Sequence, residues 1–335
     1  MKLPHFLFII ITYCLCQTAF ARRLNYIEAH NLRLSSQTHS PHWINPFVFN
    51  KNPGSFEFNT LVSGQKDVLK LYNDMESKDE QKIIDRLEES FGKPYDLSAK
   101  ISVGLKAGSF SQFFSTNGGA VLLVTDPIFP ELKGFLFHDY TSTSAYIFRP
   151  TKALMLKPQV SIGFRRVLDR TLTTGDLVDK SLDVKFNKAP FIGFAEANFL
   201  ATYNTFGYGH LMGEISSFPL MSNKYEYWET FLGYKTPNFA KKLNWEFREL
   251  SFYGGYSPLY AGHYDVQRTF KAGIRLSPIK ELSLDIFTMD EFYPAGLISY
   301  TFKHFEFAMF TFERAYDDHG EQKSRQYGLN LKFAW

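Results

Sequence analysis

The chain of 335 residues carries 37 lysines and arginines against 34 aspartates and glutamates, and its net charge of +3 is too small to indicate nucleic-acid binding. Its mean hydropathy is −0.22, and no stretch of the sequence matches the roughly 20 apolar residues of a permanent membrane-spanning helix. These properties exclude a helical membrane protein but leave a transmembrane β-barrel open, because only alternate residues of a barrel strand face lipid. The aromatic content of 17% suits the girdles of a barrel, and it equally suits an aromatic-rich soluble β-protein.

Residues 1–21 have the pattern of a secretory signal peptide. A basic start precedes an apolar run over residues 6–15, and residues 19–21 read Ala-Phe-Ala, a small-x-small cleavage pattern. The run is too short for a retained anchor. The chain's 2 cysteines, Cys14 and Cys16, both lie in this segment, so the mature protein is predicted to have no disulfide and no thiol chemistry.

The next segment, residues 22–95, is predicted to precede the barrel. Residues 22–65 show weak periodicity and contain Asn52-Pro53, a candidate hatch turn. Residues 66–75 repeat apolar side chains with a helical period, which predicts a first short helix.

A second short helix is predicted to follow. Ser77 and Glu80 form a capping box at its start, and Gly92 and Pro94 mark its end. Both helices are too charged to span a membrane. They form either a plug or gating element inside or beneath the barrel, or a small periplasmic cap, and the sequence leaves both open.

Residues 96–335 alternate apolar and polar side chains with the period of two that is typical of strands, which predicts an all-β fold: a transmembrane antiparallel β-barrel of about 14 strands, with 12 as the fallback. The candidate strands, bounded by turn signals, are 97–107, 109–116, 118–125, 133–149, 157–168, 190–203, 207–216, 225–236, 243–254, 265–277, 281–289, 294–302, 304–314 and 325–335. Residues 169–189, 255–264 and 315–324 are predicted to be extracellular loops.

In two of these strands, aromatic and charged side chains lie on the same face, which we call a mixed phase. Phe310 and Phe312 share a face with Glu306, and Phe137 shares one with Asp139. Either the lumen is partly aromatic, or a β-bulge switches the phase within the strand. The bulge is the simpler explanation and is the one favoured here.

The last nine residues read as the closing strand of an outer-membrane barrel. One face suits lipid and ends on the aromatic carboxy-terminal residue, and the other face is small or polar. The apolar face is a candidate assembly signal for the barrel assembly machinery and consists of Tyr327, Leu329, Leu331, Phe333 and Trp335.

Charged residues at alternate strand positions are candidate lumen-lining groups. They are Arg165, Lys271, Arg275, Asp285 and Lys332. Such charges could set the solute preference of a pore, but solvated residues of an inert barrel would follow the same pattern, and that plainer interpretation is favoured.

No catalytic residue, metal site or cofactor is predicted. The group Asp317-Asp318-His319 in a predicted loop is the best candidate for a barrel hydrolase, yet charged loop residues produce such neighbours by chance. The histidines are dispersed, HxxxH and HExxH spacings do not occur, and glycine-rich phosphate loops are absent.

The chain resembles the FadL-like superfamily of outer-membrane barrels, including its TraF-like branch. The likeness rests on the Asn52-Pro53-Gly54 turn, on the helical segment before the strands, and on the closing sequence over residues 292–300 and 305–313. The glycine-rich run that usually precedes Asn-Pro in the hatch is missing. The resemblance implies a fourteen-stranded barrel with a luminal plug that passes or binds hydrophobic compounds.

These features predict a protein of the outer membrane of a Gram-negative bacterium, in contact with outer-membrane lipid, that passively takes up or binds hydrophobic or small solutes. Two alternatives stay open. A structural or envelope-interaction barrel would show no conductance, and a barrel hydrolase would lose activity on replacement of Asp318 or His319.

Overall fold

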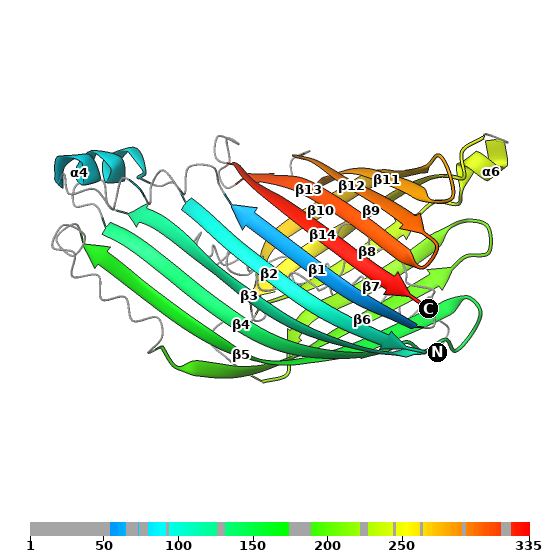
Figure 1. Cartoon of the computed structure of the whole chain (residues 1–335), viewed down its shortest axis with the longest axis horizontal. Coiled ribbons are helices and arrows are strands. Elements are labelled where there is room, and N and C mark those ends of the chain that lie inside the picture. Colours follow the sequence, from blue (N-terminus) through cyan, green and yellow to red (C-terminus); the bar gives the residue numbers. More distant parts are fainter. Residues whose placement is uncertain are drawn as a thin grey trace.

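The computed structural model describes residues 54–64, 73, 80–91, 94–125, 131–173, 189–221, 227–243, 246–261, 264–289, 293–315 and 323–335. Within these ranges the chain forms a closed antiparallel barrel in which each strand pairs with its sequence neighbour and β1 pairs with β14 (Figure 1). The predicted all-β barrel of 14 strands is therefore confirmed. The strands are β1 Gly54–Gly64, β2 Pro94–Ala107, β3 Phe110–Thr125, β4 Glu131–Tyr146, β5 Leu154–Thr173, β6 Phe191–Asn204, β7 His210–Pro219, β8 Tyr227–Lys235, β9 Glu249–Ala261, β10 Tyr264–Ser277, β11 Leu282–Met289, β12 Tyr293–Phe302, β13 Phe305–Ala315 and β14 Lys323–Ala334.

The first strand was not predicted. Residues 22–65 were expected to lie outside the barrel, whereas Gly54–Gly64 forms β1 and closes the sheet between β2 and β14. Phe56, Phe58 and Val62 lie on one face of β1, and Glu57 and Asn59 on the other, so the alternation is present in the sequence. The barrel therefore begins at residue 54 and not at residue 96.

The third strand corrects a second boundary. Residues 109–116 and 118–125 were predicted as two strands, but β3 runs unbroken through Gly118 and Gly119. Gly119 serves close packing instead of a turn, because a Cβ there would lie 2.7 Å from the carbonyl oxygen of Leu97. The missed β1 and the divided β3 offset each other in the predicted count.

Tight turns join strands at the end of the barrel where the chain terminates. Residues 108–109 connect β2 to β3, and residues 303–304 connect β12 to β13 as predicted. Gly108 (φ 58°) and Lys303 (φ 51°) adopt the left-handed conformation that two-residue hairpin loops require.

The outer face of the barrel is apolar. Outward-facing side chains such as Phe114, Ile162 and Phe270 are 59%, 59% and 68% exposed. Aromatic rings also gather on this face farther from the tight turns, where Trp228 stacks on Tyr260 with ring centroids 4.2 Å apart. Among the described residues, no helix has the length and apolar character needed to cross a membrane.

The helix α4 (Glu80–Glu89) lies at the end of the barrel far from the carboxy terminus (Figure 1). Its Leu87 is fully buried in a cluster with Val124 and Leu132. Val124 pairs directly with Leu132 and is in phase with the outward-facing Phe114, so this cluster is on the outer side of the wall. The second predicted helix is confirmed, but it packs outside the wall and is not a luminal plug.

The remaining predictions for the amino-terminal segment concern the signal peptide, Asn52, Pro53 and the first helix. They lie outside the described residues, apart from residue 73 of that helix. A second described helix, α6 (Phe239–Leu243), lies between β8 and β9.

Candidate luminal site

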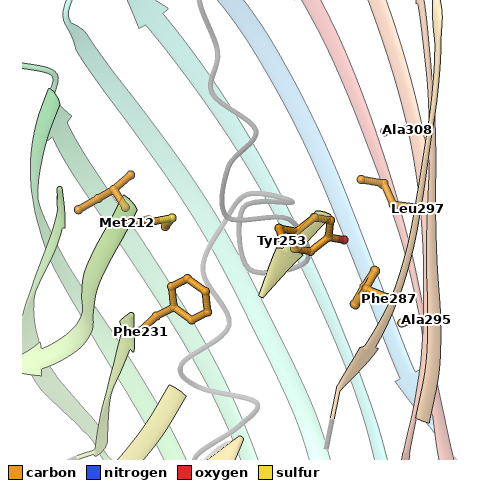
Figure 2. Close-up of a cluster of buried hydrophobic side chains, with 8 residues drawn as sticks. Met212, Phe231, Tyr253, Phe287, Ala295, Leu297 and Ala308 are labelled. Carbon is orange, nitrogen blue, oxygen red and sulfur yellow. The ribbon is translucent and has the colours of Figure 1, made fainter. Parts of the chain in front are cut away.

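The inner wall carries a cluster of apolar side chains, called here the luminal apolar cluster. Its members alternate with exposed outward-facing residues along their strands, so they face the lumen. Figure 2 shows Met212, Phe231, Phe287 and Leu297 pointing into the barrel interior from different strands. The cluster consists of Leu200, Met212, Phe231, Tyr253, Phe287, Ala295, Leu297 and Ala308, with Met155 and Phe310 packed against it.

The aromatic members lie against the wall, over glycines. A Cβ at Gly328 would lie 1.8 Å from the Phe310 ring, and one at Gly233 would lie 2.4 Å from the Phe231 ring. These inward-facing glycines therefore provide the space in which the rings lie along the sheet. The rings can therefore line the lumen without a clash, because the glycines beneath them have no side chain.

The mixed-phase strands are explained by this lining. β13 pairs with β12 and with β14 without a register shift, and β4 pairs likewise with β3 and β5. Phe310 and Phe137 thus face the lumen. The favoured β-bulge interpretation was wrong, and the alternative of a partly aromatic lumen is correct.

Arg165, predicted to line the lumen, faces inward on β5 and pairs with Asp139 of β4. Its Nε and one terminal nitrogen each donate to a different carboxylate oxygen, both at 2.8 Å. The two side chains are only 8% and 6% exposed. The guanidinium also lies 5.0 Å from the centroid of the Phe194 ring.

Arg275 and Asp285, which were also predicted lumen residues, are directly opposite each other on β10 and β11. Arg275 donates to Asp285 at 3.2 Å and lies 3.6 Å from Glu249. Glu249 in turn accepts from Lys235 at 2.7 Å. Two cations and two carboxylates thus form one neutral network near the tight-turn end.

Lys332, the last described member of the predicted set, faces inward on β14. Its Nζ donates to Glu306 of β13 at 3.0 Å. Two residues earlier on β14, Asn330 donates to Asn59 across the closing strand pair. The side chain of Lys271 lies outside the described part of the chain.

The structure thus brings Arg275 and Asp285 together and gives Arg165 and Lys332 carboxylate partners that the sequence reasoning did not assign. The effect of these residues on solute preference stays a prediction. A partly aromatic lumen was stated as the alternative to a β-bulge and was not the favoured interpretation. A usable signal existed in β8, where Phe231 is in phase with Glu229 and Lys235.

The carboxy-terminal face has the predicted arrangement. Tyr327, Phe333 and Trp335 are exposed on the outer wall, and Leu329 and Leu331 share their phase. Its role as an assembly signal stays a prediction.

The hydrolase alternative stays a prediction. Another neighbouring His-Asp pair of the sequence, His138 and Asp139, projects to opposite faces of β4, where the two side chains cannot act on one substrate. Residues 317–319 lie outside the described ranges. In the ranges that the structure describes, no group of three or more His, Cys, Asp or Glu side chains could hold a metal ion.

A closed barrel with an apolar outer wall and a charged, partly aromatic inner wall has the architecture of a transmembrane β-barrel. No family model matches the sequence, and no curated protein sequence matches it either.

Solved structures share the barrel architecture at low identity. Similar chains include CdiB from Acinetobacter baumannii (11% identity, 84% of this chain and 60% of that chain, TM-score 0.38). They also include a deletion mutant of the monoaromatic hydrocarbon channel TodX (10% identity, 85% and 90%, TM-score 0.47). The toluene transporter TbuX of Ralstonia pickettii gives similar values (9% identity, 85% and 90%, TM-score 0.47). This chain spans 60% of the length of CdiB.

At these identities the likeness is one of fold, and the barrel itself is established by the chain's own strand pairing.

Proposed function

We propose that this protein is an outer-membrane barrel of a Gram-negative bacterium that binds small, largely apolar solutes in its lumen and passes them across the membrane. The luminal apolar cluster is the observation that carries the proposal. The lumen of a water-filled porin is polar. An inner wall that presents aromatic and aliphatic surface instead offers a solute about 25 cal/mol for each Å² of apolar area removed from water.

Three ion pairs of the inner wall support an uncharged or weakly charged solute. Asp139 is paired with Arg165, Lys332 with Glu306, and Arg275 with Asp285. Because each pair combines opposite signs at short range, none of them presents a strong field of one sign to a passing solute. Apolar contact would then contribute more to selection than net charge.

The proposed orientation follows from the turns. Short turns belong on the periplasmic side of bacterial barrels, and the tight turns of this chain lie at the carboxy-terminal end. The opposite end, with α4 outside the wall, would then face the cell exterior. This orientation argues against the predicted periplasmic cap.

The test is binding of a neutral naphthalene-based fluorescent dye to the full chain in lipid nanodiscs, with empty nanodiscs subtracted. Phe231→Asn removes an aromatic ring from the luminal apolar cluster and is expected to weaken binding about tenfold, equivalent to about 1.4 kcal/mol. Phe270→Asn, an equal change on the outer wall, is the matched control and should leave binding within about twofold.

Dye binding that is no stronger than to empty nanodiscs, or that is equally sensitive to both variants, would contradict luminal binding. A correctly folded barrel without binding would favour the structural or envelope-interaction alternative.

A further inference from the structure

A basic and aromatic group occupies the outer wall where β3, β4, β5 and β6 lie side by side. We call it the outer-wall basic cluster, and it consists of Thr116, His138, Tyr140, Arg166 and Phe191. The guanidinium of Arg166 lies 4.0 Å from the centroid of the Phe191 ring. His138 Nε2 forms a 2.8 Å hydrogen bond with Thr116 Oγ1, and its ring lies 4.4 Å from that of Tyr140.

Strand register places the whole cluster on the outside. His138 is directly opposite Arg166, Thr116 is opposite Tyr140, and Arg166 is opposite Phe191. Tyr140 and Phe191 are about half exposed, like the outward-facing apolar residues around them. The luminal Asp139–Arg165 pair lies on the other face of the same strands.

The position of the cluster along the membrane normal can be estimated from the aromatic residues at the tight-turn end. Tyr146 and Phe110 are paired and exposed there, as expected of one interfacial girdle. His138 lies about eight residues along β4 from Tyr146, or about 20 Å along the membrane normal for a strand tilted by about 40°. Since the apolar band of a barrel is about 25 Å tall, the cluster lies near its far edge.

A lipid-facing arginine is costly at the bilayer midplane and nearly neutral at an interface. At that level the surrounding molecules are lipid head groups, and a guanidinium matches the geometry of a phosphate in a bidentate contact. The wall beside Arg166 also leaves room, since nothing lies within 4 Å of the Cβ position of the outward-facing Gly193.

We infer that the outer-wall basic cluster binds the phosphate of an anionic lipid head group in the outer leaflet. Arg166 supplies the charge, with Phe191 beneath it, and His138 and Thr116 supply polar contacts. Tyr140 and Phe191 provide surface for the adjoining part of the lipid. The inference rests on the membrane placement in the proposed function, but it does not depend on transport.

The experiment is native mass spectrometry of the full chain in detergent, titrated with phosphatidylglycerol and, in parallel, with zwitterionic phosphatidylcholine. Arg166→Gln is expected to weaken the tightest phosphatidylglycerol binding about fivefold and to leave phosphatidylcholine binding unchanged. His138→Gln should give a smaller loss. Lys303→Gln is the matched control, because Lys303 also lies over a ring, that of Phe302, but at the opposite end of the barrel.

Equal phosphatidylglycerol binding by Arg166→Gln and Lys303→Gln would overturn the inference. So would an equal loss for both lipids, or full displacement of the lipid by equimolar inorganic phosphate. Heat-modifiable gel migration shows whether each variant is folded, and dye binding by Arg166→Gln tests the luminal function separately. A failure of either proposal can therefore be distinguished from a failure of the other.

Discussion

Asp139 and Arg165 are paired on the inner wall in a setting where a lone charge is costly. Both side chains are almost fully buried, and two parallel hydrogen bonds join them. Removing a charge from water costs several kcal/mol, which only a well-aligned partner offsets. Removal of one partner from this buried pair should therefore lower the free energy of unfolding much more than removal of one partner from a partly exposed pair.

Asp139→Asn is expected to lower the free energy of unfolding by about 3 kcal/mol, because it leaves the Arg165 charge buried without a counter-charge. The measurement is the urea midpoint of the protein folded into lipid vesicles, followed by tryptophan fluorescence. Glu306→Gln, in a pair whose carboxylate is 28% exposed, should cost less than about 1 kcal/mol. Similar midpoint shifts for the two variants would show that water reaches the Asp139 pair.

For single residues, the alternation of apolar and polar side chains along a strand was sufficient to find inward-facing charges such as Arg275 and Asp285. It did not reveal which residues they pair with. Asp139 was passed over because Phe137 shares its face and suggested a bulge. Pairing across strands depends on register, and register is set by turn lengths that a single sequence specifies only loosely. The partly aromatic lumen was stated as an alternative but was not favoured, because a β-bulge within a strand explains the same mixed pattern more simply.

Among the elements, β1 shows the limit of local patterns. Its alternation is short and is blurred where Leu61 and Val62 are adjacent, and its partner β14 is at the other end of the chain. In β3, the predicted break between residues 116 and 118 was wrong, because the strand runs unbroken through both glycines, of which Gly119 serves close packing. By contrast, β10, β11 and β14 were predicted closely, because each alternates cleanly between well-defined turns.

The closing pair can be tested by cross-linking, because the only cysteines of the chain lie in the predicted signal peptide. Asn59 and Asn330 are directly opposite each other on the inner face, so Asn59→Cys with Asn330→Cys should form a disulfide under mild oxidation. The product would show altered mobility on a non-reducing gel.

Thr60→Cys with Asn330→Cys serves as the control for this pair, since Thr60 projects from the opposite face of β1. Cross-linking of the control as efficiently as of the Asn59 pair would contradict the register. No cross-link in either pair would indicate that β1 does not close the barrel.

On the scale of the whole molecule, apolar exposure outside and polar burial inside reverse the distribution of a water-soluble protein. Such a surface is stable only when lipid or detergent covers it. Closure also leaves no free sheet edge, so that every strand has two hydrogen-bonded neighbours. The molecule should therefore be insoluble without lipid or detergent, and resistant to unfolding within it.

The protein from an outer-membrane fraction is expected to migrate differently on a denaturing gel before and after boiling, because a closed barrel resists detergent at room temperature. Deletion of residues 327–335 removes most of β14 and should abolish the shift. Recovery of the unmodified protein in the soluble periplasmic fraction, without a heat-dependent shift, would contradict both the membrane placement and the proposed transport.

The pairing of β1 with β14 also has a kinetic consequence. Asn59 and Asn330 are separated by 271 positions, whereas every other strand pairs with its immediate neighbours in sequence. Bringing such distant segments together carries the largest loop-closure entropy in the fold. The ladder can be completed only after the carboxy terminus has been delivered, and until then β1 exposes an unpaired edge. Closure should therefore be the last step of folding, and the step at which a chaperone has most to protect.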